Sequence, residues 1–220
     1  MHIPDGPIIA PKIHIATAVI TAIACAIAVK MSSKSLDEKK VPLIGVTSSF
    51  VFAAQMLNFP IGLGTSGHFL GAVLTSVLLG PWNAFIVIAV VLTTQCFILA
   101  DGGFTALGSN IFNMGVIGGL ASYGIFRLLT LFFPKTKAGF LAAVGIVSWF
   151  SVVLASAACA AEIGVTRLSE LYDIKYVLPA MAGVHAIIGI GEAVITVTVV
   201  SMIMAYRKDV IYNYELRIKN

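Results

Sequence analysis

Seven long apolar segments, separated by short polar or charged connections, make up most of this chain. Crossing the roughly 30 Å hydrocarbon core of a bilayer takes about 20 consecutive apolar residues in a helix. The pattern therefore predicts an all-α, polytopic integral membrane protein. The segments run over Ile8 to Val29, Pro42 to Asn58, His68 to Leu79, Trp82 to Ala100, Asn110 to Phe133, Ala138 to Ala161 and Ala180 to Tyr206.

The third segment, His68 to Leu79, is too short to cross a membrane on its own. At about 1.5 Å per residue, its twelve residues span little more than half of the hydrocarbon core. It must be sheltered by protein or continued by irregular backbone. Merging it with the next segment across Gly80 and Pro81 would reduce the count to six spans.

The positions of the basic residues favour seven spans, an outer N-terminus and a cytoplasmic C-terminus. Eleven of the 14 lysines and arginines fall on one side of the membrane only if the spans number seven. That side is cytoplasmic by the positive-inside rule, and only Lys12, Arg167 and Lys175 remain outside. The eleven are Lys30, Lys34, Lys39, Lys40, Arg127, Lys135, Lys137, Arg207, Lys208, Arg217 and Lys219.

Composition supports one membrane domain over residues 1–220 and leaves no room for a soluble catalytic domain. Hydrophobic residues make up 59% of the chain and charged residues 11%. We expect an extracytoplasmic N-terminus at residues 1–7, a helical membrane domain at residues 8–206 and a cytoplasmic tail at residues 207–220. No Gly-Lys-Ser or Gly-Lys-Thr phosphate-binding sequence occurs, so any ATP hydrolysis belongs to another chain.

Charge, cysteines and the N-terminal sequence each exclude a further class of function or processing. The net charge of +4 is dispersed over loops that flank the apolar segments, which is typical of topology signals and not of a nucleic-acid surface. Three cysteines within apolar segments indicate neither a disulfide framework nor a thiolate metal site. Residues 8–29 imitate a signal peptide, but no basic region precedes them, so we expect the N-terminus to be retained.

The first two residues, Met1 and His2, carry the most specific chemical signal in the sequence. A histidine in second position brings the α-amine, its own backbone amide nitrogen and an imidazole nitrogen within reach of one metal ion. If these three nitrogens lie in a plane, a fourth nitrogen completes a square, which Ni(II) and Cu(II) favour over tetrahedral Zn(II). His68 is the leading candidate for that fourth ligand. The methionines are dispersed and form no thioether ladder, which disfavours copper transport.

The seven-span count brings the proposed ligands to one face of the membrane. Met1, His2, His68 and Asp101 all fall at the outer face, and His68 follows a run rich in glycine, residues 62–67. Thr65 and Ser66 in that run are candidates to hydrogen-bond the second imidazole nitrogen, as metal-bound histidines require. Asp101 is a candidate to orient the N-terminal amine or a histidine.

Other polar residues within the apolar segments are weaker candidates for the site. His14, near the outer end of the first segment, and His185, near the outer end of the seventh, are alternatives for the fourth ligand. Glu192 lies deeper and is either functional or a structural hydrogen-bonding group, because a charge at such depth is costly. Asn110 is a polar neighbour of the site, and we expect it to make a buried bond between helices and not to bind metal.

Four runs of residues resemble the CbiM/NikM family, the substrate-capture subunits of nickel and cobalt energy-coupling-factor transporters. Together they cover nearly the whole chain in order, and every chelating position is matched. Phe69, Phe104 and Ser109 depart from the residues more common in the family without affecting the ligands. The runs are Met1 to Gly6, Gly64 to Ala72, Asp101 to Asn110 followed by Asn113 to Gly115, and His185 to Thr196.

This resemblance implies a seven-helix protein of the prokaryotic cell membrane that captures metal at its outer face. The Met1 amine, the His2 amide and imidazole, and His68 would bind the metal, with no catalytic cofactor. The implied partners are a transmembrane coupling subunit and two cytoplasmic ATPase subunits, and a small accessory membrane subunit is a further candidate. Four nitrogens in a square favour Ni(II), although Co(II) also fits the site.

Two other classes of function compete with this interpretation. An autonomous ion-coupled metal transporter or channel would distribute acidic residues and histidines through the membrane, whereas only Glu192 lies deep here. An intramembrane hydrolase using His185 and Glu192 would need a closely spaced set such as His-Glu-x-x-His, which the sequence lacks.

Overall fold

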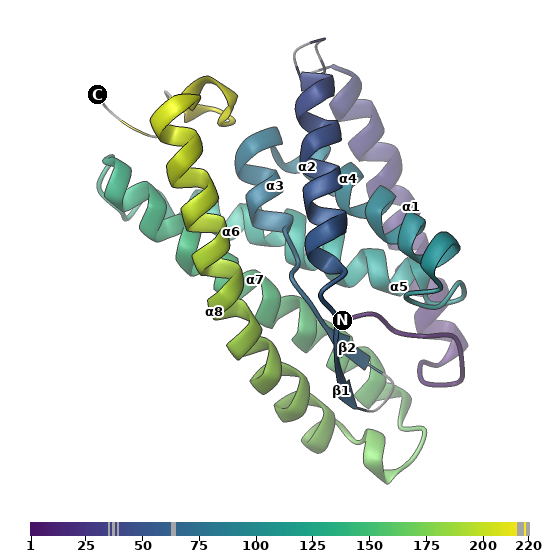
Figure 1. Ribbon diagram of the computed structural model, residues 1–220. Helices are drawn as coiled ribbons and strands as arrows, with labels where there is room; N and C mark the ends of the chain where they lie inside the picture. The colour runs from purple at the N-terminus through teal and green to yellow at the C-terminus, as the bar shows by residue number, and fades with distance from the viewer. Residues whose placement is uncertain (35, 37, 39, 63–64, 215–217, 219–220) are drawn as a thin grey trace.

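The protein is a helical bundle, known here from a computed structural model (Figure 1). The structure describes residues 1–34, 36, 38, 40–62, 65–214 and 218; Lys39, Gly64, Arg217 and Lys219 lie outside these residues. The α-helices are α1 (Pro11–Ser33), α2 (Lys40–Gln55), α3 (Ala72–Leu79), α4 (Pro81–Thr94), α5 (Leu107–Ile111), α6 (Ser122–Leu129), α7 (Lys137–Thr166) and α8 (Ile174–Tyr206). Two π-helical segments, η1 (Gln95–Leu99) and η2 (Phe112–Ala121), and two 3₁₀ turns, η3 (Glu170–Tyr172) and η4 (Lys208–Val210), complete the helical structure.

Five helical stretches among the described residues are long and apolar enough to cross a membrane. They are α1, α4 with η1, the continuous run α5–η2–α6, α7 and α8. Helix α2 has 16 residues and α3 has eight, so neither reaches that length. Every residue of α3 is buried, as expected of a short segment that must be sheltered by protein. The count of seven spans and the sidedness of the termini remain predictions.

The fold is not entirely α-helical, because the loop after α2 forms a β-hairpin. Strand β1 (Phe59–Gly62) pairs antiparallel with β2 (Thr65–Gly67), with Phe59 opposite Gly67. A Cβ atom on Gly67 would lie 2.5 Å from Ile188 Cδ1, so the hairpin packs closely against α8. The expectation of an all-α protein is therefore corrected at this hairpin, which leads into His68.

The longest helices, α7 and α8, form an antiparallel pair along one side of the bundle (Figure 1). Gly189 of α8 allows close approach, since a Cβ there would lie 3.0 Å from Trp149 Cδ1 of α7. The Trp149 indole Nε1 also donates a hydrogen bond of 2.9 Å to the Ala186 carbonyl. Such contacts give the pair the close packing that helix association in lipid requires.

The C-terminal ends of α1 and α8 lie at the same end of the bundle, at the top of Figure 1. Lys30 lies in the last turn of α1, and Arg207 follows α8 directly. This arrangement is the one that the distribution of basic residues requires. The N-terminus and the hairpin lie further down, and residues 1–3 are buried in the protein interior, with Met1 and Ile3 completely inaccessible to solvent (Figure 1).

Candidate metal centre

The loop between η1 and α5 holds the N-terminal segment through backbone and side-chain hydrogen bonds. The Ile3 N–H donates to Asn110 Oδ1 (2.8 Å), and the Ile3 carbonyl accepts from Asn110 Nδ2 (3.1 Å) and from the Gly103 N–H (2.8 Å). Asn110 is 2% exposed. The oxygen and the nitrogen of its side-chain amide both bond to the backbone of Ile3. The expected bond between helices is instead a bond between a helix and the N-terminal segment.

Asp5 fastens the same segment at its exposed end. Its carboxylate accepts the Phe104 N–H (3.0 Å), the Thr105 N–H (2.8 Å) and the Thr105 hydroxyl (2.6 Å). These bonds, first those from Thr105, lower the pKa of Asp5 below its ordinary value. Residues 3 and 5 are thus both fixed to the loop, which determines where Met1 and His2 lie.

The N-terminal amine of Met1 lies in the protein interior as a ready nitrogen donor. It donates a hydrogen bond to the carbonyl of Ser66 in β2, and Met1 is completely buried. Burial lowers the pKa of the amine from 8.0 to about 5, against weaker opposing effects of Cys159 and Asp101. The amine is therefore neutral at pH 7 and has a lone pair available for a metal ion.

The imidazole of His2 is also buried, with 4% of the residue exposed. Its Nδ1 lies 2.7 Å from Asp101 Oδ1, and its Nε2 has no hydrogen-bond partner among the described residues. Burial lowers the pKa of His2, and the hydrogen bond to Asp101 offsets part of this effect. Asp101 was proposed to orient the amine or a histidine, and the structure places it against His2.

His68 faces His2 across a short distance. Their ring centroids are 4.6 Å apart, with an angle of 60° between the planes. His68 is completely buried, and its Nδ1 donates to the Phe69 carbonyl at 2.7 Å. Because a carbonyl can only accept, the neutral ring carries its proton on Nδ1 and presents an unprotonated Nε2. That Nε2 is buried and makes no hydrogen bond within the described chain.

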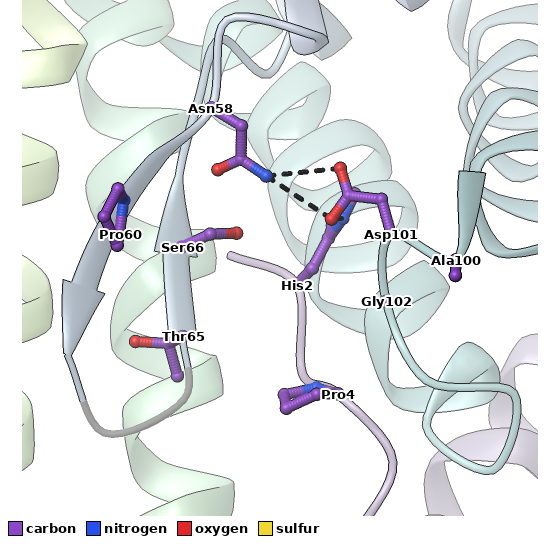
Figure 2. A pocket seen from close by; sticks show the side chains of 9 residues that line it. All are labelled: His2, Pro4, Asn58, Pro60, Thr65, Ser66, Ala100, Asp101 and Gly102. Atoms are coloured by element: carbon purple, nitrogen blue, oxygen red, sulfur yellow. Dashed lines mark hydrogen bonds and ion pairs between the residues drawn. The ribbon is translucent and has the colours of Figure 1, made fainter.

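A cavity of about 490 Å³ is lined by His2 and Asp101 (Figure 2). Asn58, which also lines it, donates from Nδ2 to both carboxylate oxygens of Asp101, at 3.3 and 3.2 Å. Burial raises the pKa of Asp101, but the bonds from His2 and Asn58 outweigh it and leave a lowered pKa. The lining residues are His2, Pro4, Asn58, Pro60, Thr65, Ser66, Ala100, Asp101 and Gly102.

The two hydroxyl groups expected to support the imidazoles are those of Thr65 and Ser66 in β2. Thr65 Oγ1 donates to the sulfur of Met181 at 3.1 Å, whereas the buried Ser66 hydroxyl has no hydrogen-bond partner in the described structure. Ser66 contributes through its backbone carbonyl, which accepts the Met1 amine. The hydrogen bond that orients His68 is accepted by the Phe69 carbonyl. Every residue has a backbone carbonyl, so the residue type at position 69 does not predict this bond.

The two alternative histidines differ in their distance from the cluster. His14 on α1 is partly exposed and lies 3.4 Å from the Ser109 hydroxyl, outside the cavity lining. His185 on α8 is completely buried, close enough to the Met1 amine and His68 for their charged forms to interact. Its Nδ1 contacts the Met181 carbonyl at 2.7 Å.

Side chains alone do not form a metal site in this region. In the part of the chain that the structure describes, no group of three or more His, Cys, Asp or Glu side chains is arranged to hold a metal ion. Other nitrogen donors lie at this position, namely the amine of Met1 and the backbone amide of His2, beside the imidazoles of His2 and His68.

The chain is similar in sequence and in fold to known metal transport proteins. The family described as "Cobalt uptake substrate-specific transmembrane region", CbiM, matches residues 2–210. A protein of Archaeoglobus fulgidus, whose assigned name is that of a fused nickel transport protein NikMN, is 39% identical over 96% of this chain and 68% of its own length. The fused nickel transport protein NikMN of Rhodobacter capsulatus is 31% identical over 91% of this chain and 61% of its own. The crystal structure of a truncated transition metal transporter matches with a TM-score of 0.85 and 33% identity, covering 94% of this chain and 99% of that one.

Proposed function

Because this chain belongs to the CbiM family of cobalt and nickel uptake proteins, we propose that it captures Ni(II) at the extracytoplasmic face of the cell membrane. Co(II) is the second candidate cargo. Four nitrogen donors in one plane give the tetragonal field that favours Ni(II), and the preference for nickel follows from that geometry. The metal is the transported substrate, so this subunit has no catalytic role in the proposal.

The observation that carries the proposal is the burial of the N-terminal amine together with two imidazoles. Met1 is inaccessible to solvent, His2 is 4% exposed and the rings of His2 and His68 are 4.6 Å apart. The Nε2 atom of His68 is buried and lacks a hydrogen-bond partner in the described structure. Buried polar atoms are normally hydrogen-bonded, so this exception favours a bound ligand at His68 Nε2.

The proposed ligands are the Met1 amine, the His2 amide nitrogen, the His2 imidazole and His68 Nε2. The amine and amide close a five-membered ring on the metal, and the amide and Nδ1 of His2 close a six-membered ring. Nδ1 of His2 contacts Asp101 in this structure. Chelation therefore requires a half-turn of the ring about its Cβ–Cγ bond, which exchanges the Asp101 contact for the metal.

We further propose that uptake is driven by ATP hydrolysed in partner chains, as in an energy-coupling-factor transporter. The partners would be a transmembrane coupling subunit and two cytoplasmic ATPase subunits, with a small accessory membrane subunit as a further candidate. The runner-up function is an autonomous ion-coupled transporter or channel. It is disfavoured because His2, His68 and Asp101 lie together beside the N-terminus, and a relay across the bundle would need titratable groups spaced along it.

The test of capture is Ni(II) titration of the purified protein in detergent. His68→Ala should abolish high-affinity binding, because it removes one nitrogen donor without altering any long helix. His14→Ala should bind nearly as tightly as the native protein and serves as the matched control. Near-native affinity of His68→Ala, in protein of native helix content, would overturn the proposed ligand set.

A further inference from the structure

Residues 68–71 connect β2 to α3, include His68 and form neither a helix nor a strand. Their backbone N–H and C=O groups lie in the interior, where each needs a partner. Gly71 has a φ of +75°, and a Cβ there would lie 2.9 Å from both Phe69 and Val51. The path of this connection is therefore narrowly constrained, and its polar groups are satisfied from two other helices.

Glu192 of α8 accepts hydrogen bonds from two consecutive backbone amides of this connection. The Leu70 N–H donates to Oε2 and the Gly71 N–H donates to Oε1, both at 2.8 Å. Glu192 is 1% exposed, so its carboxylate is directed entirely at this backbone. The carboxyl group also lies at the N-terminus of α3, where the helix dipole favours its ionised form.

Gln55 of α2 holds the same connection from the other side. Its Nε2 donates to the Leu70 carbonyl at 2.9 Å, and the residue is completely buried. The peptide group between Leu70 and Gly71 is thus held at both ends, at its carbonyl by Gln55 and at its N–H by Glu192.

The preceding peptide group connects Glu192 to the imidazole of His68. The Phe69 carbonyl and the Leu70 N–H belong to one planar peptide unit. The carbonyl accepts the Nδ1 proton of His68, and the N–H donates to Glu192. A continuous chain therefore runs from the Glu192 carboxylate through one peptide group to His68 Nδ1, with the unprotonated Nε2 on the far side of the ring.

We propose that Glu192 and Gln55 are positioning residues of the metal site. Glu192 acts on His68 through the Phe69–Leu70 peptide group, and Gln55 supports that group by holding the next one, between Leu70 and Gly71. The inference rests on the proposed function, since it concerns the ligand strength of His68. In many metal sites a carboxylate accepts a hydrogen bond from the second ring nitrogen of a metal-bound histidine and orients the ring. Here a peptide group lies between the Glu192 carboxylate and His68 Nδ1. The carboxylate fixes the peptide plane, and polarisation along the hydrogen-bonded chain raises the basicity of Nε2.

Glu192→Gln tests this role, because the amide keeps the size of the side chain but changes its bonding. The Gln oxygen can accept only one of the two N–H groups cleanly, and its own NH₂ then faces a second donor. Ni(II) affinity should fall roughly 10- to 100-fold, the range for lost support of a ligating histidine. The absorption band of bound Ni(II) should move to longer wavelength as the ligand field weakens.

Thr196→Val is the matched control on the same buried face of α8. Thr196 is completely buried and its hydroxyl makes no hydrogen bond within the described residues. This variant should keep the affinity within about twofold and the absorption band unchanged. If Glu192→Gln binds Ni(II) with native affinity and a native spectrum, the inference is overturned. It is equally overturned if affinity falls with thermal stability while the spectrum of bound metal stays native.

Gln55→Leu provides a second, independent variant should Glu192→Gln fail to fold. It should also weaken Ni(II) binding and shift the band, and the double variant should lose less than the sum of the two effects, since both act on one segment. Strict additivity, or a native spectrum in Gln55→Leu, would contradict the inference. His68→Ala separates the two claims. Native Ni(II) affinity in His68→Ala would reject the proposed site. Loss of Ni(II) binding in His68→Ala, together with native affinity and a native spectrum in Glu192→Gln, would reject only the positioning role.

Discussion

Gly103 and Asp5 lie so close that their backbones leave no space for a side chain between them. A Cβ atom on Gly103 would lie 2.3 Å from Asp5 N and 2.5 Å from Pro4 C. Both neighbours are backbone atoms of the inserted segment, so a rotamer change cannot relieve the overlap. The loop that follows η1 and the N-terminal segment therefore fit together only with glycine at position 103.

Gly103→Ala should displace the N-terminal segment and weaken Ni(II) binding by about tenfold or more, equivalent to about 1.4 kcal/mol. Gly119→Ala is the matched control, because a Cβ there would meet its nearest neighbour at an ordinary 3.7 Å. Calorimetric titration of both variants gives the comparison. Equal affinities for the two variants would show that the close contact does not position the ligands.

The buried amine predicts how many protons leave when the metal binds. Burial lowers its pKa from 8.0 to about 5, so near pH 7.5 it is already neutral. Binding should then release about one proton per metal, the one lost by the His2 amide. Calorimetry in buffers of different ionisation enthalpy measures this number. Release of about two protons would contradict a buried neutral amine, and release of none would contradict an amide ligand.

The same pKa determines how pH changes the equilibrium between two states of the N-terminus, one seated in the protein interior and one displaced into solvent. A displaced, solvated amine has a pKa near 8.0, so between pH 8 and about 5 the displaced state binds more protons than the seated one. Seating should weaken steadily as the pH falls through this window. Labelling of the α-amine by an amine reagent, corrected for its neutral fraction, should show greater accessibility at pH 5.5 than at pH 8. Unchanged accessibility would contradict burial of a neutral amine.

His185 tests whether the metal has a ligand outside the square. Its Nε2 is buried without a hydrogen bond among the described residues, and its ring lies near the amine and His68. In a four-nitrogen site, His185→Ala should keep Ni(II) affinity within about tenfold of native and leave the bound ion diamagnetic. A loss as large as that of His68→Ala would make His185 a ligand.

The long apolar segments could be predicted from sequence because hydrophobic length is a property of residue type. The expectation that His68 to Leu79 needs shelter agrees with the complete burial of α3. The convergence of Met1, His2, His68 and Asp101 followed from the side of the membrane assigned to each loop. The structure brings these four together, although the number of spans behind that assignment remains a prediction.

What the sequence could not indicate are the contacts made by backbone groups. The hairpin of β1 and β2 is a glycine-rich run that packs against Ile188 of α8, a residue distant in sequence. The carbonyl of Ser66 accepts a hydrogen bond from the Met1 amine, and the carbonyl of Phe69 accepts one from His68. Because every residue has a carbonyl, the sequence does not indicate which ones make these bonds. Glu192 was identifiable as a costly buried carboxylate, but its targets, Leu70 and Gly71, depend on how α8 packs.

The most direct test of the account is an N-terminal extension, because only a site built from the free amine depends on where the chain begins. One residue added before Met1 converts its amine into an amide and removes the terminal chelate ring. Ni(II) binding by this protein, with the intact extension verified by mass spectrometry, should be lost almost as fully as in His2→Ala. The same residue added after Asn220 should leave binding unchanged. Native Ni(II) affinity in the N-terminally extended protein would contradict the proposed site, even if His68 proved essential.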